Sequence, residues 1–299
     1  MLDVFLDVVL PVALVAILGG VFGHWRGATV APISALVFYL FSPALVFSSL
    51  SRTTLSADVS LRIVGVILVT FAIIYAGASL WSLLRRHDPS LRAGFALGAT
   101  TPNTGNMGLP VAQLAFGDAG LQVAVVAFVT GAVLVNSAGI AVASLAGGAR
   151  REVLAAPFRY PALYAAAAGV AVNVLGADLP TTVDAPVSSL AAAAVPTMLV
   201  VLGLQLRAAG RRDNLIDTSA AGLARLVIAP GAAWLAAGLI GLDGATRATL
   251  VVLAAMPTAV ITTILATEFH AQPAFVTRVV VTSTLASMLS LTLLITLVR

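Results

Sequence analysis

Long apolar runs separated by short polar segments dominate the chain. A helix that spans the hydrocarbon core of a membrane needs about 20 apolar residues. Ten segments of about this length fit the sequence, and the connections between them are too short for a soluble domain. The segments are 4–22, 29–50, 60–84, 91–114, 120–146, 159–176, 184–206, 219–241, 246–268 and 273–298. The pattern therefore predicts an all-α polytopic membrane protein with a single membrane domain over 1–299.

Composition agrees with this class. The chain is 60% hydrophobic and 9% charged, whereas soluble domains carry about 25% charged residues. Cysteine is absent, which excludes disulfides, thiolate metal sites and a cysteine nucleophile. The first apolar run, 4–22, lacks a preceding basic region and is interpreted as a retained helix rather than a signal peptide.

The arginines predict how the helices are oriented, because cytoplasmic connections are enriched in basic residues. Connections after the odd-numbered segments carry ten arginines, and the opposite side carries four. The ten are Arg26, Arg85, Arg86, Arg92, Arg150, Arg151, Arg159, Arg207, Arg211 and Arg212; the four are Arg52, Arg62, Arg247 and Arg299. Both termini are therefore predicted to lie outside the cytoplasm, in a cell inner (plasma) membrane. Because these arginines lie in short connections, the net charge of +4 does not predict a nucleic-acid partner.

The two halves of the chain resemble each other. Arg92–Leu134 aligns with Arg247–Leu289 at a constant offset of 155, which matches Pro102 with Pro257. Pro11 and Pro161, and Pro43 and Pro196, pair in the same order. Two repeats of five helices follow, over 1–146 and 153–299. Since five is odd, the second repeat enters from the opposite face, an arrangement found in many secondary transporters.

A polar segment, Thr-Pro-Asn-Thr-Gly-Asn-Met-Gly-Leu-Pro, interrupts the fourth predicted helix at 101–110. Proline and glycine break a regular helix, and within a membrane such a break is tolerated where it is buried in protein or lines a cavity. The free N–H groups where the helix restarts favour an anion. The predicted binding residues are Pro102, Asn103, Gly105 and Asn106. The alternative is a packing kink, in which the asparagines bond across helices.

The ninth predicted helix carries the equivalent proline, Pro257, but no glycine beside it. Its break is expected to be shallower, and the two broken helices are expected to cross. Thr258 and Thr262 could line the site, or could bond back to carbonyls one turn earlier. The assignment of this half rests on its equivalence with the fourth helix.

Three further polar residues lie inside predicted helices. Asn136 in the fifth helix is either a ligand or an interhelical hydrogen-bonding group, and both alternatives stay open. Arg225 and Arg278 lie about two turns from predicted cytoplasmic ends and are expected to extend towards the membrane surface. Arg278 could instead pair with Glu268 or counter a second carboxylate of a substrate. No catalytic or metal-ligating residues are predicted.

The motif Pro102–Pro110, followed by Phe116-Gly117, resembles the signature of the auxin efflux carrier family. Ser42–Phe47 and Ala266–Phe269 also resemble family patterns, and the resemblance covers essentially the whole chain. It implies ten helices in two inverted repeats with broken, crossing helices, and an elevator-like carrier for organic anions. In such carriers the crossover prolines and neighbouring asparagines contact the substrate carboxylate, which here falls on Pro102, Asn103, Asn106 and Pro257.

The predicted function is a secondary carrier, by efflux or uptake, of small organic anions such as mono- or dicarboxylates. The expected partners are this substrate and the lipid bilayer, with no cofactor. A sodium-coupled symporter is the alternative, and proton or sodium coupling and a homodimer stay open. An intramembrane enzyme is disfavoured, because the sequence has no HExxH, aspartate-pair or Ser/Lys arrangement. A sensor is disfavoured because paired broken helices would serve no purpose in it.

Overall fold

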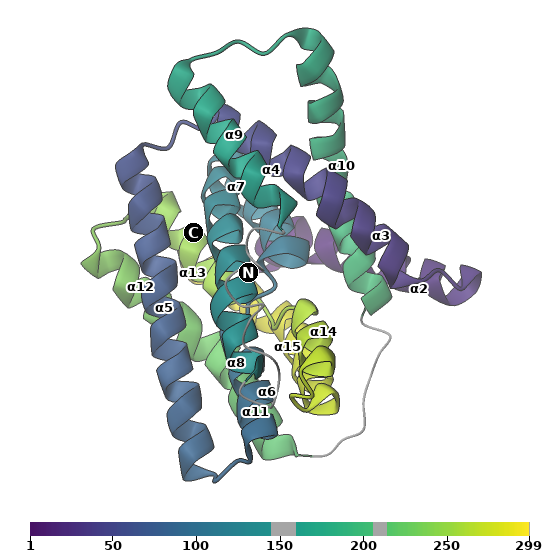
Figure 1. Cartoon of the computed structure of the whole chain (residues 1–299), viewed down its shortest axis with the longest axis vertical. Helices are drawn as coiled ribbons and strands as arrows, with labels where there is room; N and C mark the ends of the chain where they lie inside the picture. The colour runs from purple at the N-terminus through teal and green to yellow at the C-terminus, as the bar shows by residue number, and fades with distance from the viewer. Residues whose placement is uncertain (145–159, 206–213, 299) are drawn as a thin grey trace.

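The computed structural model describes residues 1–144, 160–205 and 214–298, and these are almost entirely helical (Figure 1). The described residues contain no β-strand, and their one isolated β-bridge joins Pro102 to Thr258. Seven helical stretches within them are long and apolar enough to cross a membrane. The prediction of an all-α polytopic membrane protein is therefore confirmed.

Most predicted segments coincide with observed helices. The seven candidate spans are Leu2–Arg26, Val30–Ser51, Ala57–Leu84, Thr104–Ala143, Thr181–Gln205, Leu215–Leu239 and Pro273–Val298. The predicted segment 159–176 contains only the shorter helix α9, Pro161–Leu175. The predicted segments 91–114 and 246–268 are each divided into two helical pieces. The count of ten spans and the inverted repeat stay predictions.

The helix divides at both predicted prolines. α6 (Pro89–Thr100) ends before Pro102, and the chain becomes helical again in η3 (Thr104–Gly108) and α7 (Leu109–Leu134). α13 (Gly244–Ala254) ends before Pro257, and α14 (Ile261–Glu268) follows it. Proline lacks an N–H group and its ring clashes with the preceding turn, so a helix cannot run through these positions undisturbed.

A bend separates the two parts of α7. Gly117 has φ 64° and ψ −155°, a backbone conformation that strongly favours glycine. The bend lets the chain reverse between the predicted fourth and fifth helices although the helical assignment continues across it.

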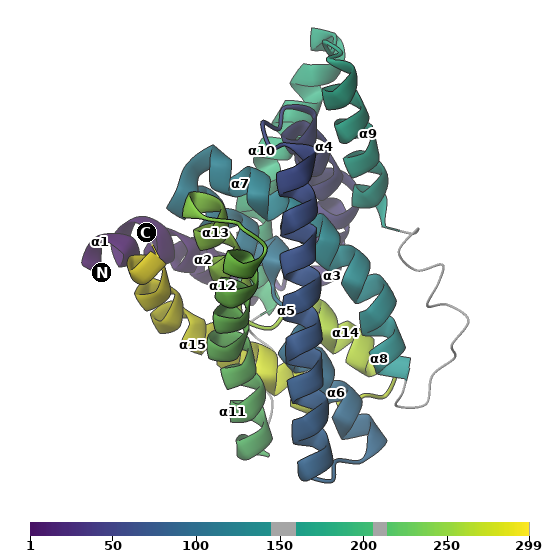
Figure 2. The same cartoon turned by 90° about the vertical axis from the view of Figure 1, so that its left-hand side faces the viewer.

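The helices form two groups (Figures 1 and 2). The first helix group contains α2 (Leu10–Arg26), α3 (Val30–Leu36), α4 (Ser42–Ser51), α9 and α10 (Thr181–Gln205), which pack against one another. The second helix group contains α5 (Ala57–Leu84), α6, α7, α8 (Ile140–Ser144), α11 (Leu215–Leu223), α12 (Ala229–Leu239), α13, α14 and α15 (Pro273–Val298). Both helix breaks lie in the second group.

The first helix group is held by direct backbone contact. A Cβ atom placed at Gly203 of α10 would lie 1.7 Å from the carbonyl oxygen of Ala16 in α2. Glycine at Gly19 has the same role, since a Cβ there would lie 2.4 Å from the carbonyl oxygen of Val200. Small residues allow this close approach where lipid supplies no hydrophobic force between helices.

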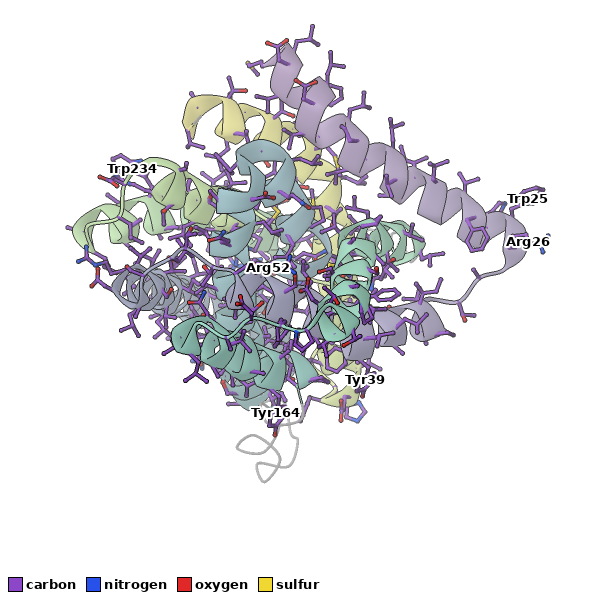
Figure 3. All side chains as sticks on the ribbon, turned by 90° about the horizontal axis from the view of Figure 1, so that it is seen from above. Trp25, Arg26, Tyr39, Arg52, Tyr164 and Trp234 are labelled. Atoms are coloured by element: carbon purple, nitrogen blue, oxygen red, sulfur yellow. The ribbon has the colours of Figure 1, made fainter. Side chains whose placement is uncertain are left out.

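The outer surface suits a lipid environment. Large apolar side chains along α2 and α5 are exposed, among them Leu18 and Leu61. Trp25, Tyr39, Tyr164 and Trp234 lie exposed on the periphery (Figure 3). Tryptophan and tyrosine are enriched at membrane interfaces, where the ring meets the headgroups. The protein is a multi-pass membrane protein.

The predicted orientation rests largely on residues that the structure does not describe. Arg150, Arg151, Arg159, Arg207, Arg211, Arg212 and Arg299 lie outside the described residues, as do the predicted repeat boundaries at 146 and 153. The placement of both termini outside the cytoplasm stays a prediction.

Candidate functional site

The two helix breaks are hydrogen-bonded to each other. The N–H of Asn103 donates to the carbonyl of Pro257 at 2.7 Å, and the N–H of Ala259 donates to the carbonyl of Thr101 at 3.0 Å. Between these bonds Pro102 and Thr258 form the antiparallel bridge. Backbone groups that both helices leave unpaired are thus satisfied inside the protein, as a membrane interior requires. The two broken segments therefore form one crossover.

Thr258 fastens this crossover. Its hydroxyl donates to the carbonyl of Gly98 at 2.7 Å, and its N–H donates to the hydroxyl of Ser283 at 3.1 Å. The hydroxyl of Thr262 bonds back to the carbonyl of Ala259. Both threonines are fully buried. Because their hydroxyl protons are already engaged within the protein, a ligand would meet them only as acceptors, and their binding role stays a prediction.

Asn103 places unpaired donors at the start of η3. Its side chain is 4% exposed, and Nδ2 has no acceptor among the described residues. Its carbonyl accepts the N–H groups of Met107 and Gly108, at 3.3 and 3.0 Å. The intervening N–H groups of Gly105 and Asn106 have no acceptor in the described part of the chain. An amide and two backbone N–H groups at a helix start are donors suited to an anion.

Asn106 connects the crossover to the first helix group. Its Nδ2 donates to Oε1 of Gln205, the last residue of α10, at 3.4 Å. Sequence reasoning did not single out Gln205; its only signal was an uncharged amide at the end of a predicted apolar helix. Gly105 packs against a ring, since a Cβ there would lie 2.9 Å from Phe128. Glycine is needed at this position for close packing.

The remaining predicted site residues have different surroundings. Pro102 lines a cavity beside the crossover, whereas Pro257 is buried within it. Asn136 donates from Nδ2 to the carbonyl of Ala132 at 2.8 Å, one turn earlier in its own helix, and does not line that cavity. The structure therefore brings Pro102, Asn103, Gly105, Asn106, Pro257, Thr258 and Thr262 together and leaves Asn136 apart.

The expectation that Arg225 extends towards the membrane surface is wrong. Its side chain lies in η7 (Ala224–Ile228), and the residue is 2% exposed. One terminal nitrogen donates to the carbonyl of Ala99 at 3.0 Å, and the other donates to that of Ala254 at 2.6 Å. Arg225 thus bonds the last carbonyls of α6 and α13 together.

Helix electrostatics explain this position. The last four carbonyls of a helix have no intrahelical partner, and each helix C-terminus carries roughly half a unit of negative charge. Two such ends meet at the crossover, and a single guanidinium with several donors can serve both. The sequence signal was an arginine in the middle of a predicted apolar helix, where intramembrane charge favours a functional role.

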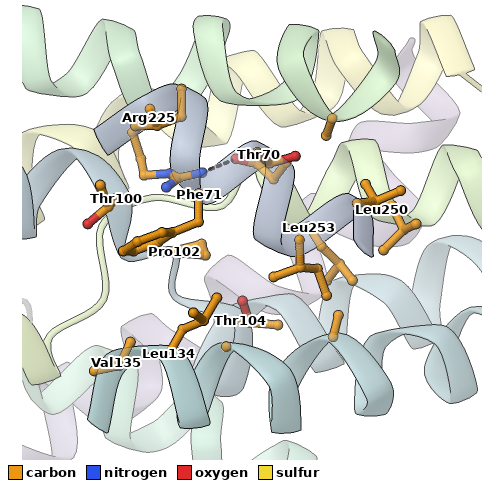
Figure 4. A pocket seen from close by; sticks show the side chains of 17 residues that line it. Thr70, Phe71, Thr100, Pro102, Thr104, Leu134, Val135, Arg225, Leu250 and Leu253 are labelled. Carbon is orange, nitrogen blue, oxygen red and sulfur yellow. Dashed lines mark hydrogen bonds between the residues drawn. The ribbon is translucent and has the colours of Figure 1, made fainter. Parts of the chain in front are cut away.

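A cavity opens behind the crossover, within the second helix group (Figure 4). It includes about 640 Å³ of space free of atoms, part of it open. Arg225, Thr70, Thr100, Pro102 and Thr104 contribute to its wall. Apolar side chains supply most of the remainder: Val66, Ile67, Phe71, Ile74, Leu134, Val135, Leu250 and Leu253.

Known proteins resemble this chain over nearly its whole length. A profile of the membrane transport protein family matches residues 4–153 and, again, 148–295. An uncharacterised transporter of Methanothermobacter thermautotrophicus is 30% identical over 96% of both chains. A protein of Rhizobium meliloti named "Putative malonate transporter" is 27% identical over 91% of this chain and 88% of its own.

A second archaeal protein, an uncharacterised transporter of Methanocaldococcus jannaschii, is 24% identical over 89% of both chains. These relatives are named as transporters and none as an enzyme. Together with the paired helix breaks and the motif at Pro102–Pro110, the family match gives the chain its place. It belongs to the membrane transport protein family, which includes the auxin efflux carriers that the motif resembles.

Proposed function

We propose that the protein is a secondary carrier of small organic anions, mono- or dicarboxylates, across an inner (plasma) membrane. The substrate carboxylate binds at the start of η3, against Pro102, Asn103 and Asn106, with Pro257 on the opposite segment. The observation that carries this proposal is the buried, unpaired amide of Asn103 beside two unpaired backbone N–H groups. Unpaired buried donors cost about 1–3 kcal/mol each, so their retention favours a ligand that satisfies them.

The substrate class has independent support. A carboxylate offers the acceptor oxygens that amide and backbone donors require. The Rhizobium meliloti relative is named for malonate, a dicarboxylate. Both findings favour small carboxylates over sugars or cations as substrates.

The two helix groups suggest the transport movement. Ten helices in two inverted repeats would let the second group carry the crossover past the first by alternating access. The family profile matches the chain twice in succession, which supports a repeat. The bond from Asn106 to Gln205 is then a contact between the moving and the fixed parts that must break during transport.

Arg225 bears on the choice of coupling ion. In carriers with broken helices, unwound carbonyls and half-helix C-terminal ends coordinate the coupling cation. Here the carbonyls of Ala99 and Ala254 accept hydrogen bonds from a resident guanidinium. This arrangement favours carboxylate transport without sodium over the sodium-coupled alternative.

A screen of thermal unfolding tests the proposal. The purified protein is heated with mono- and dicarboxylates, in sodium and in choline salts. A ligand that binds only the folded state stabilises it by about 2.7 kcal/mol at 100 times its Kd. We expect at least one carboxylate to raise Tm equally in both salts. Absence of stabilisation by any carboxylate would contradict the proposal, and stabilisation only in sodium would favour the symporter.

A further inference from the structure

The cavity behind the crossover contains two buried polar groups that the protein leaves unpaired. The hydroxyl of Thr70, in a residue 8% exposed, has no hydrogen-bond partner among the described residues. Nε of Arg225 also has none, although the two terminal nitrogens bond to Ala99 and Ala254. Figure 4 shows Thr70 and Arg225 together at one end of the cavity. That end therefore offers two free hydrogen-bond donors beside a positive charge.

No carboxylate of the described residues forms an ion pair with Arg225. A buried cation without a counter-ion is costly, and the two helix ends supply only partial negative charge. An anionic head group would add a full opposite charge and would accept from both Nε of Arg225 and the Thr70 hydroxyl. A carboxylate has two oxygens and can take both bonds at once.

The rest of the cavity requires an apolar ligand. Phe71 and Ile74 come from α5, Leu134 and Val135 from the α7–η4 helix, and Leu250 and Leu253 from α13. Leu134 and Val135 lie on the wall opposite Arg225 (Figure 4). Gly131 leaves room here, since a Cβ at this position would meet nothing within 4 Å. The atom-free space, about 640 Å³, lies within the range of about 300–1,000 Å³ for small-molecule sites.

We propose that this cavity is a second ligand site, which takes an amphipathic monocarboxylate. The carboxylate bonds to Arg225 Nε and to the Thr70 hydroxyl, and the alkyl chain lies between α5 and α7. The site is separate from the start of η3, because Asn103 and Asn106 do not line the cavity. A ligand here contacts Pro102 and the arginine that joins α6 to α13, so it acts on the crossover from behind.

The test measures binding of a series of unbranched carboxylates, from acetate to decanoate, to the purified full chain. Oleate in lipid vesicles is the second arm, because a fatty acid from the bilayer has the same chemistry as a water-borne acid. Affinity is expected to rise with chain length. Saturation at medium chains indicates a water-borne ligand, and preference for oleate indicates a bilayer source; both outcomes support the site.

Two variants locate the binding. Gly131→Leu fills the cavity and should weaken decanoate binding by more than about tenfold. Thr70→Val removes one hydrogen bond to the carboxylate at almost constant volume and should weaken it about tenfold. Gly77→Leu and Thr282→Val are the matched controls, because both positions are exposed and lie outside the cavity. Neither control should change the affinity.

The Asn103→Ala variant separates this inference from the proposed function. It should keep decanoate binding while it loses the carboxylates that bind at η3. Loss of decanoate binding in Asn103→Ala but not in Gly131→Leu would overturn the second site and leave the crossover as the only one. Binding that is independent of chain length, or unaffected by both cavity variants, would also overturn it, because water alone would then fill the cavity.

Discussion

Asn103 and Pro257 come from opposite halves of the chain, yet a 2.7 Å hydrogen bond joins the N–H of the first to the carbonyl of the second. This bond and its neighbour from Ala259 to Thr101 hold the two broken helices in one crossover. The start of η3 is thereby fixed against the opposite break. Positions that support the crossover should affect stability, whereas positions that face the ligand should affect binding.

Replacement of Arg225 should destabilise the crossover. Arg225→Leu leaves the carbonyls of Ala99 and Ala254 without their donors, and loss of two buried hydrogen bonds costs about 2–5 kcal/mol. We expect a clearly lower Tm, measured by thermal unfolding in detergent, with partial recovery in Arg225→Lys. Arg62→Gln is the control, because Arg62 forms an exposed pair with Asp58 worth less than about 1 kcal/mol. A Tm equal to that of Arg62→Gln would contradict the role of Arg225.

The hydroxyl of Thr258 should contribute to stability. Thr258→Val keeps the shape of the side chain but leaves the carbonyl of Gly98 unpaired, at a cost of about 1–3 kcal/mol. Thr258→Ser retains the hydroxyl and should lose much less. Thermal unfolding of the two variants checks this, and equal Tm values would show that the bond to Gly98 is unimportant.

A methyl group at Gly203 should separate α2 from α10. Because the added Cβ would lie 1.7 Å from the carbonyl oxygen of Ala16, Gly203→Ala forces the two backbones apart. We expect poor yield or a strongly reduced Tm. Gly231→Ala on α12 serves for comparison, since a Cβ there meets nothing within 4 Å. Similar stability of the two variants would be inconsistent with this packing.

Gln205 should affect transport more than stability. Gln205→Leu removes the acceptor for Nδ2 of Asn106, a 3.4 Å contact between the helix groups. The rate of carboxylate uptake into proteoliposomes is expected to change severalfold while Tm stays within about 1–2 °C, since one long hydrogen bond contributes little. An unchanged uptake rate would rule out this contact as part of the movement.

The sequence predicted the helix spans and the breaks because their causes are local. Apolar length marks a span, and Pro102 and Pro257 interrupt helices wherever they occur. The donors at η3 follow from the same segment. Their neighbour in the other half, Pro257, was found through the offset of 155 residues.

Contacts between distant segments could not be predicted in this way. Arg225 is separated from Ala99 by 126 residues, and Thr258 is separated from Gly98 by 160. A one-dimensional pattern records that a residue is polar within an apolar run, but not which helix end it reaches. The cavity at Thr70 is likewise formed by helices that meet only in three dimensions.

The central claim is that a substrate carboxylate binds to the donors around Asn103. The most direct measurement is the Kd of the carboxylate that stabilises the protein best, determined for wild type, Asn103→Ala and Asn136→Ala. Asn136 is the matched control, because its amide bonds to its own helix. The account predicts at least about tenfold weaker binding in Asn103→Ala, as expected for loss of a hydrogen bond to a charged group, and no change in Asn136→Ala. Equal affinities in all three proteins would contradict it.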